Sequence, residues 1–192
     1  MRAVVQPNYP PRGSMASCAA NIHNYSDYQM KPEEFKREID RIRQKVPELI
    51  NTYGPRIAGT IAVSEFKRNF QTESFDGKKW PEVKRRTAGH PAYKYAARHH
   101  PARLTRAILT GDTGDLGRSI EIKKAEQGEA TIWTSPSAFG SKQPYGAVHN
   151  EGLKAGRGAG FMMPKRQFIG RTDALDDKIV KELERQMGRI LK

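Results

Sequence analysis

Between residues 33 and 71 apolar residues recur at the spacing of an α-helix, and this pattern limits the fold more than any other feature of the sequence. In the first half they are separated by 4, 3, 4 and 3 residues, so they share one helical face. They are Phe35, Ile39, Ile42, Val46 and Leu49, and a second set continues with Ile57, Ile61, Ala62, Phe66 and Phe70. Pro47 and Gly54-Pro55 predict one or two interruptions, because proline removes a backbone donor.

The remaining regular elements predicted are a β-hairpin and a C-terminal helix. In "SIEIKK" and "EATIWTS" apolar and polar residues alternate, and Gln127-Gly128 supplies a turn between them. From about residue 172 to 191 apolar residues return at helical spacing, with Thr172 or Asp173 as the N-cap. The predicted fold class is α+β, with a long N-terminal helical region, a small antiparallel sheet built round the hairpin, and a C-terminal helix.

The composition predicts a modest core with exposed extensions. The chain has 192 residues, 36% of them hydrophobic, and a net charge of +13. Residues 1–30 are rich in Pro, Gly and polar groups and are interpreted as a flexible arm, which leaves 31–192 as a single domain. No apolar run approaches the roughly 20 residues that span a bilayer, so no membrane contact is predicted.

Positive charge is concentrated between residues 78 and 106. Nine Lys and Arg residues stand there against Glu82, and nine minus one leaves +8 of the total +13. We expect a long, mobile, exposed basic loop at about 82–107, with a short helix near 93–99. The candidate contacts to a partner or polyanion are Lys84, Arg85, Arg86, Arg98, Arg103 and Arg106. A nucleic-acid-binding module that uses residues 78–106 is therefore the alternative function.

Asp112-Thr113-Gly114 matches the tripeptide of aspartic proteases, but that chemistry needs a second carboxylate sharing one proton. The chain has no second copy of the tripeptide. The stretch is instead interpreted as a connector into the hairpin. Gly111, Gly114 and Gly117 would bend its backbone, and the aspartates would cap local amides. Leu109, Leu116 and Ile120 would be its buried anchors.

The other reactive side chains form no pattern typical of a catalytic site. The histidines 90, 99, 100 and 149 have no carboxylate or thiol at metal-ligand spacing, and Cys18 lies in the predicted arm. His149 is expected to hydrogen-bond to neighbouring backbone. "GRGAG" at 156–160 lacks the dinucleotide fingerprint, and no P-loop or Gly-x-Ser-x-Gly elbow is present. The sequence predicts no catalytic residues, no metal, no cofactor, and a protein that is not an enzyme.

Four separated stretches carry a resemblance to a known family. They are "FDGKKWPE" (75–82), "ILTGDTGDLGRSI" (108–120), "YGAVHNEG" (145–152) and "MPKRQFIG" (163–170). In this order they resemble the signature of the phage virion morphogenesis family, which includes tail completion proteins of Mu-like and P2-like phages. The similarity spans about residues 33 to 191. The matching positions are Asp76, Gly77, Trp80, Leu116, Ser119, Ile120, Tyr145, His149, Gly152, Pro164, Arg166, Phe168 and Gly170.

The resemblance implies a small α+β protein that assembles phage or prophage virions without catalysis. Its implied task is tail completion or head–tail joining through ring-type contacts, in a homo-oligomer of about six copies. The implied partners are other tail or head–tail connector proteins, with weak nucleic-acid contact through the basic segment. The implied location is the virion, and the host bacterial cytoplasm during assembly.

The core candidates follow from the apolar periodicity. They are Phe35, Ile39, Ile42, Ile61, Phe66, Phe70, Trp80, Leu116, Ile120, Ile132, Trp133, Phe168, Leu175, Ile179 and Leu183. Ile132 and Trp133 are adjacent in a predicted strand and point to opposite faces, so one of the two is a candidate interface residue.

Overall fold

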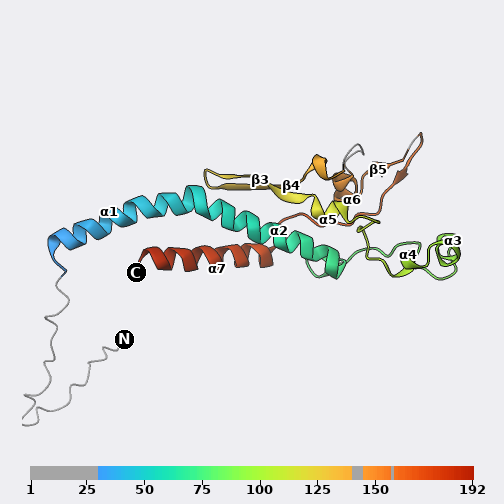
Figure 1. Cartoon of the computed structure of the whole chain (residues 1–192), viewed down its shortest axis with the longest axis horizontal. Coiled ribbons are helices and arrows are strands. Elements are labelled where there is room, and N and C mark those ends of the chain that lie inside the picture. Colours follow the sequence, from blue (N-terminus) through green and yellow to red (C-terminus); the bar gives the residue numbers. More distant parts are fainter. Residues whose placement is uncertain (1–29, 140–144, 157) are drawn as a thin grey trace, which may run out of the picture. The chain divides into compact units, whose positions relative to one another are not determined.

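The computed structural model describes residues 30–139, 145–156 and 158–192. The predicted arm therefore lies outside the described residues, except for Met30. The chain divides into two compact units, Met1–Glu38 and Ile39–Lys192. Of the first unit the structure describes residues 30–38, which include the beginning of helix α1 (Pro32–Glu48). The rest of the fold described below belongs to the second unit (Figure 1).

The predicted helical region is present, but its interruption differs from the expected one. Helix α1 passes through Pro47, and a π-helical turn, η1 (Leu49–Tyr53), joins it to α2 (Gly54–Thr72). The predicted break at Gly54-Pro55 is wrong, because both residues are helical. The N–H of Gly54 donates to the carbonyl of Leu49, five residues back. This wider turn stands immediately before Pro55, whose ring would otherwise collide with a carbonyl one normal turn earlier.

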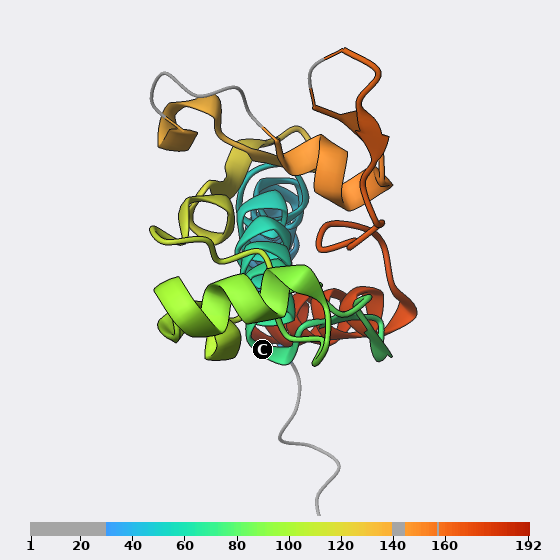
Figure 2. The ribbon, with the colours of Figure 1, turned by 90° about the vertical axis from the view of Figure 1, so that its right-hand side faces the viewer.

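Helix α2 is the centre of the second unit. It packs against helix α7 (Asp173–Ile190) and against the hairpin of β3 (Ile120–Glu126) and β4 (Glu129–Thr134). Figure 1 shows α2 between α7 and the hairpin, and Figure 2 shows it nearly end-on. Gly59 permits the close approach of the hairpin, because a Cβ there would lie 2.8 Å from Cδ1 of Ile122. The predicted α+β fold class is confirmed.

The hairpin and the C-terminal helix form as the sequence predicts. The strands pair antiparallel from Ile120 opposite Thr134 to Glu126 opposite Glu129, with an irregularity after Ile122. Both turn residues have positive φ, 53° at Gln127 and 77° at Gly128, as a type I′ hairpin turn requires. The hydroxyl of Thr172 accepts a hydrogen bond of 3.2 Å from the amide of Leu175 and caps α7.

Short elements connect these parts. Two-stranded pairs are formed by β1 (Ser74–Phe75) with β2 (Lys78–Lys79) and by β5 (Lys154–Ala155) with β6 (Phe161–Met162). The short helices are α3 (Pro91–His99), α4 (Ala102–Thr105), α5 (Asp115–Arg118), η2 (Pro136–Phe139) and α6 (Gly146–Glu151). The short helix predicted near 93–99 is confirmed as α3, whereas α4 was not predicted. In the described residues no helix combines the length and the apolar character needed to cross a membrane.

The core gathers where α2, α5, α7 and the hairpin meet. Its buried residues are Ala62, Phe66, Phe70, Trp80, Ile108, Leu116, Ile120, Phe168 and Leu175. The ring of Phe70 lies 5.6 Å from that of Trp80, edge to face, and 5.1 Å from that of Phe168. Ile132, Ile61 and Ile179 pack against this core while partly buried.

Part of the predicted core lies elsewhere. Phe35 is 58% exposed and Ile39 39%, so placing them in the core was wrong for this single chain. Leu109 is half-buried with a φ of 63°, and its neighbour Ile108 is the fully buried anchor instead. Leu109 still packs against the core from its left-handed backbone, so the predicted anchor is partly buried and Ile108 beside it is buried.

The connector at 108–119 follows the predicted path with different contacts. Gly111 and Gly114 have positive φ, whereas Gly117 lies inside α5 beside the ring of Phe70 and does not bend the chain. The carboxylate of Asp112 accepts from Arg106, with Arg103 3.6 Å away, where an amide cap was expected. The partners of this exposed carboxylate are therefore the cationic side chains of Arg106 and Arg103, because an ion pair attracts a carboxylate more strongly than an uncharged amide does.

Candidate functional site

The family-motif segment around residues 166–170 is held from three sides. The side-chain oxygen of Asn150 accepts hydrogen bonds of 2.9 Å from the amides of both Phe168 and Ile169. The amide of Asn69 donates to the carbonyl of Phe168 at 3.1 Å, and the indole of Trp80 donates to that of Gln167 at 2.7 Å. The segment thereby joins α2, α6 and the stretch after β2.

Arg166 is a buried cation within this junction. Its guanidinium donates to the carbonyls of Pro81 (2.9 Å) and Glu82 (3.3 Å), and its amide donates to the carbonyl of His149 (2.8 Å). Burial lowers the pKa of Arg166 from its ordinary value, and the guanidinium nevertheless remains charged at pH 7. Arg166 therefore ties three motif stretches together through backbone carbonyl groups.

The other motif positions serve the backbone or the core. Asp76 and Gly77 form the left-handed turn between β1 and β2, and Gly152 is the left-handed C-cap of α6. The buried hydroxyl of Ser119 donates to the carbonyl of Leu116 at 2.7 Å. The remaining positions are placed as follows: Trp80, Leu116, Ile120 and Phe168 in the core, Tyr145 packed against it, Pro164 exposed, and Gly170 beside Phe75.

Two arginines of the basic segment point inward and fix its path. Arg86 makes two hydrogen bonds of 2.8 Å to the carboxylate of Glu73, the left-handed C-cap of α2. That carboxylate also accepts from the amide of Ile108 at 2.7 Å. The pKa of Glu73 is lowered from its ordinary value near 4.5, and the hydrogen bonds from Arg86 are the largest cause. The guanidinium of Arg85 donates to the carbonyls of Arg103, Arg106 and Ala107 at 2.8, 2.9 and 3.2 Å.

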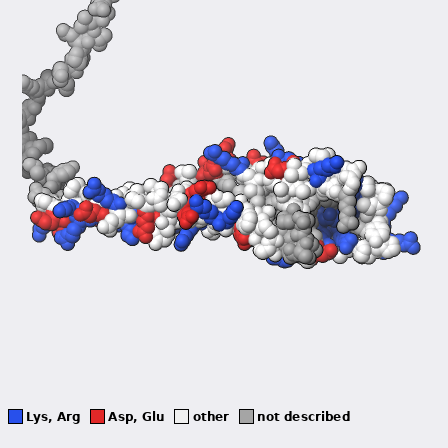
Figure 3. Space-filling view, turned by 90° about the horizontal axis from the view of Figure 1, so that it is seen from above, with Lys and Arg blue, Asp and Glu red and all other residues white. Residues whose placement is uncertain are grey.

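The predicted cations meet motif residues in one cavity of about 450 Å³, which we call the arginine pocket. It is lined by Val83, Arg85, Arg103, Arg106, Ile108, Leu109, Gly111, Asp112, Tyr145, His149 and Arg166. Four guanidinium groups stand there against one carboxylate, so the pocket favours an anionic group. Figure 3, which views the molecule from above, shows Lys or Arg atoms inside a hollow of the surface.

His149 lines the arginine pocket and has one ring nitrogen without a hydrogen-bond partner among the described residues. Its Nδ1 is buried and has no hydrogen-bond partner in the described structure, so the bond expected between His149 and neighbouring backbone is not made by this nitrogen. Its ring lies edge to face with that of Tyr145, at 5.7 Å. Burial, followed by the charge of Arg166, lowers the pKa of His149 from its ordinary value near 6.5. The imidazole is therefore mostly neutral at pH 7.

The other two predicted contact residues lie outside this pocket. Lys84 and Arg98 are exposed, the second on α3. In the described ranges no cluster of three or more His, Cys, Asp or Glu side chains is placed to hold a metal ion. The structure thus divides the six predicted cations into three that line the arginine pocket, Arg86 in its ion pair, and two at the surface.

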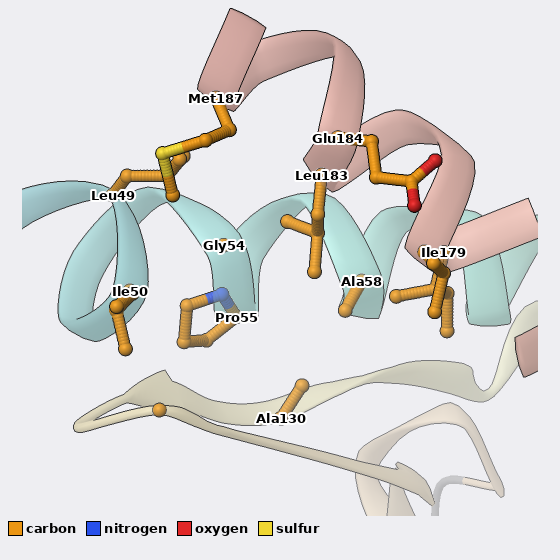
Figure 4. A pocket seen from close by; sticks show the side chains of 12 residues that line it. Leu49, Ile50, Gly54, Pro55, Ala58, Ala130, Ile179, Leu183, Glu184 and Met187 are labelled. Atoms are coloured by element: carbon orange, nitrogen blue, oxygen red, sulfur yellow. The ribbon is translucent and has the colours of Figure 1, made fainter. Parts of the chain in front are cut away.

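An apolar cavity of about 530 Å³ lies among the N-terminal half of α2, helix α7 and the end of the hairpin, and we call it the α7 groove. It is lined by Leu49, Ile50, Gly54, Pro55, Ala58, Gly128, Ala130, Ile179, Val180, Leu183, Glu184 and Met187. Figure 4 shows these side chains converging from η1 and α2, from α7, and from the end of the hairpin. Val180 and Ile50 are more than half exposed, so the groove is open to solvent. Glu184 is the one charged residue among the lining residues.

A second apolar surface lies on α1, and we call its four residues the α1 stripe: Phe35, Ile39, Ile42 and Val46. Across α1, which the structure describes in full, no residue is buried. Ile42 and Val46 are half-buried and the first two are exposed. The guanidinium of Arg41 donates to the carbonyl of Ile190 at 2.5 Å, which marks where α7 reaches α1.

Sequence reasoning did not find the α7 groove or the role of Glu73. The lining of the groove comes from three chain segments about 50 to 70 residues apart, so no local pattern announces it. Glu73 follows a helix as an ordinary charged residue, and its partners Arg86 and Ile108 are 13 and 35 residues away. The one local signal was the position of Glu73 between a helical run and the Asp76-Gly77 turn.

Fold and site together define a small α+β protein whose inward polar side chains fix chain segments, with apolar surface left on the outside. Over residues 30–188 the chain matches the model of the phage virion morphogenesis family. The protein belongs to that family, as the motif resemblance predicted, and a role in phage assembly is supported. No curated protein and no solved structure matches the chain.

Proposed function

We propose that this protein is a tail completion or head–tail joining subunit that acts through ring-type contacts between its copies. The observation that carries the proposal is unpartnered apolar surface on a virion morphogenesis protein. The α1 stripe and the α7 groove are both open in the single chain. Exposed apolar patches typically mark protein–protein contacts.

The proposed role is not catalytic. The polar residues of the motif stretches hold backbone groups: Arg166 donates to two carbonyls, Asn150 accepts from two amides, and Arg85 donates to three carbonyls. Such bonds position surfaces for binding. The proposed partners are other tail or connector proteins, in the virion and in the host cytoplasm during assembly.

The test is a phage or induced prophage lacking this gene. We expect separate heads and tails in electron micrographs of the lysate and a large drop in infectious particles. Purified protein added to that lysate restores infectivity. Incubation with isolated tails or isolated heads before mixing tells tail completion from head–tail joining. Normal particle yields without the gene would overturn the proposal.

Nucleic-acid contact through the basic segment is the second candidate function. Lys84, Lys94 and Arg98 are exposed, and no ion pair engages them in the described structure, which favours it. A phosphate-binding surface loses affinity steeply as salt rises. Fluorescence anisotropy of a labelled duplex between 50 and 200 mM salt (roughly the range over which such contacts weaken) tests it. Affinity that stays weak at low salt, or that is unchanged in Lys84→Glu/Arg98→Glu, rejects this candidate.

A further inference from the structure

The α1 stripe has the form of a helix that binds in a groove. Phe35, Ile39 and Ile42 stand at positions i, i+4 and i+7, the anchor spacing by which an amphipathic helix docks. Phe35 and Ile39 are 58% and 39% exposed. A phenylalanine and an isoleucine exposed side by side on one helix lose hydrophobic free energy to water unless a partner covers them.

The α7 groove has the matching form of a receptor. Its volume of about 530 Å³ falls within the range of ligand-sized pockets, roughly 300–1,000 Å³. The walls are formed by apolar side chains of α7 and of the η1–α2 junction, with Ala130 at the hairpin side (Figure 4). Among the small lining residues, Gly128 leaves room for side chains that enter from outside, because a Cβ there would meet nothing within 4 Å.

Charge also matches between the two surfaces. Glu184 is the charged group of the groove, and in the described residues no cation pairs with it. On α1, Lys36 and Arg43 lie on the same side of the stripe, since they are seven residues apart and each follows a stripe residue. Neither has an ion-pair partner among the residues that the structure describes. Docking would bring a carboxylate on the groove to the cationic edge of the stripe.

We propose that the α1 stripe of one copy docks in the α7 groove of the next copy. The stripe and the exposed lining of the groove are different residue sets, so each copy offers one of each. Such a heterologous contact repeats from copy to copy and closes into a ring when its rotation closes. This inference rests on the proposed function, since it names the surfaces that make the ring-type contacts.

Directed cross-linking tests the pairing. In a Cys18→Ser background, two single variants, Ile39→Cys and Val180→Cys, carry one cysteine each, because Cys18 is the one natural cysteine. A short bismaleimide is added to protein at a concentration at which analytical ultracentrifugation shows the wild type to be oligomeric. We expect covalent dimers when the two variants are mixed, and none from either variant alone.

Other occupants give other results, each of which overturns the inference. Dimers from Ile39→Cys alone mean that stripes pair with stripes. A third chain carries both Ile39→Cys and Val180→Cys. An intramolecular link in this double variant, without dimers from the mixture of single variants, means that the groove binds α1 of its own chain. A wild type that stays monomeric, or a mixture that yields no link, excludes docking between copies.

Matched variants supply a second measurement. Phe35→Glu should weaken self-association at least about 30-fold, the usual effect of losing a central apolar anchor. Gln44→Glu, on the opposite side of α1, should leave it unchanged. Glu184→Lys should weaken association roughly three- to tenfold, and Lys36→Glu/Arg43→Glu in the same chain should restore most of the loss. Circular dichroism confirms that each variant is folded.

The two proposals fail in different ways. If Phe35→Glu remains oligomeric and restores infectivity to a lysate lacking the protein, the docking inference is wrong and the proposed function stands. If the phage assembles normally without the gene, the proposed function is wrong whatever the oligomeric state.

Discussion

Helices α1 and α2 carry the same apolar periodicity in the sequence and meet different surroundings in the fold. On α2 the residues Ala62, Phe66 and Phe70 are buried between α7 and the hairpin. On α1 the equivalent face is half-buried at Ile42 and exposed at Phe35. Helical spacing therefore shows which face is apolar and leaves open what covers that face. The uncovered α1 stripe is the surface that we propose docks on another copy.

The largest effect that tests this comparison comes from truncating one aromatic residue on each helix. Phe70→Ala removes the ring that contacts both Trp80 and Phe168, and should lower the free energy of unfolding by about 3–5 kcal/mol. Phe35→Ala should change it by less than about 0.5 kcal/mol. Urea denaturation at low protein concentration measures both values. Similar losses from the two variants would mean that α1 packs within its own chain.

The next effect compares an ion pair at the end of α2 with one on α1. Glu73→Gln should cost about 1–3 kcal/mol at pH 7, because Arg86 and the amide of Ile108 lose their charged acceptor. Glu48→Gln removes an exposed pair with Lys45 and should have no measurable effect. Thermal denaturation of the two variants and the wild type compares them.

The effect of Glu73 should depend on pH in a defined direction. Its folded pKa lies below the ordinary value near 4.5, so its stabilisation is complete above that value. It is lost as pH falls through the folded pKa. The gap between wild type and Glu73→Gln should therefore be full at pH 7 and shrink below about pH 4.5. A gap that is constant from pH 7 to pH 3 contradicts the ion pair as its source.

A smaller effect tests how closely α2 is enclosed. Gly59→Ala places a methyl 2.8 Å from Cδ1 of Ile122 and should cost about 1 kcal/mol, since overpacking exceeds the gain in helix propensity. In an Ile122→Val background the same change should become neutral or stabilising. Gly188→Ala on α7, where a Cβ meets nothing within 4 Å, should stabilise by about 0.5–1 kcal/mol. Stabilisation by Gly59→Ala alone would show that the hairpin yields.

The smallest effect is expected at the connector. Asp112 is 64% exposed in its pairs with Arg106 and Arg103, so Asp112→Asn should leave folding and assembly unchanged. Differential scanning fluorimetry and recovery of infectivity measure these. A loss of infectivity with an unchanged Tm would assign Asp112 to a partner contact at the arginine pocket.

Local sequence patterns predicted the helices and strands well, but they did not predict contacts between residues far apart in the chain. The spacing of Leu175 and Ile179, the cap at Thr172 and the Gln127-Gly128 turn are encoded within a few residues, and all three were predicted correctly. Trp80 and Phe168 were predicted as core residues and lie in the core, but nothing in the sequence showed how their segments meet.

The wrong predictions also arise from features that a local sequence pattern does not contain. Ile108 is buried, whereas the predicted anchor Leu109, whose backbone is left-handed, is only partly buried against the core, and no periodicity reveals this difference. The continuous path through Gly54 depends on a π-helical turn, whose hydrogen bond to Leu49 a proline rule does not foresee. The sequence predicts Arg85 as an exposed charge. Its carbonyl partners lie at residues 103–107, 18 to 22 residues further along the chain, so no local pattern indicates them.

The composition of the α7 groove has a consequence for the timing of association. Its walls come from residues 49–58, 128–130 and 179–187, and they face one another only after α7 has packed beside α2. A partly made chain already carries an α1 stripe but has no receptor of its own. Under the proposed docking, a chain in which α7 has not yet packed beside α2 would offer a stripe but no complete groove, so self-association would begin only after the C-terminal helix is in place.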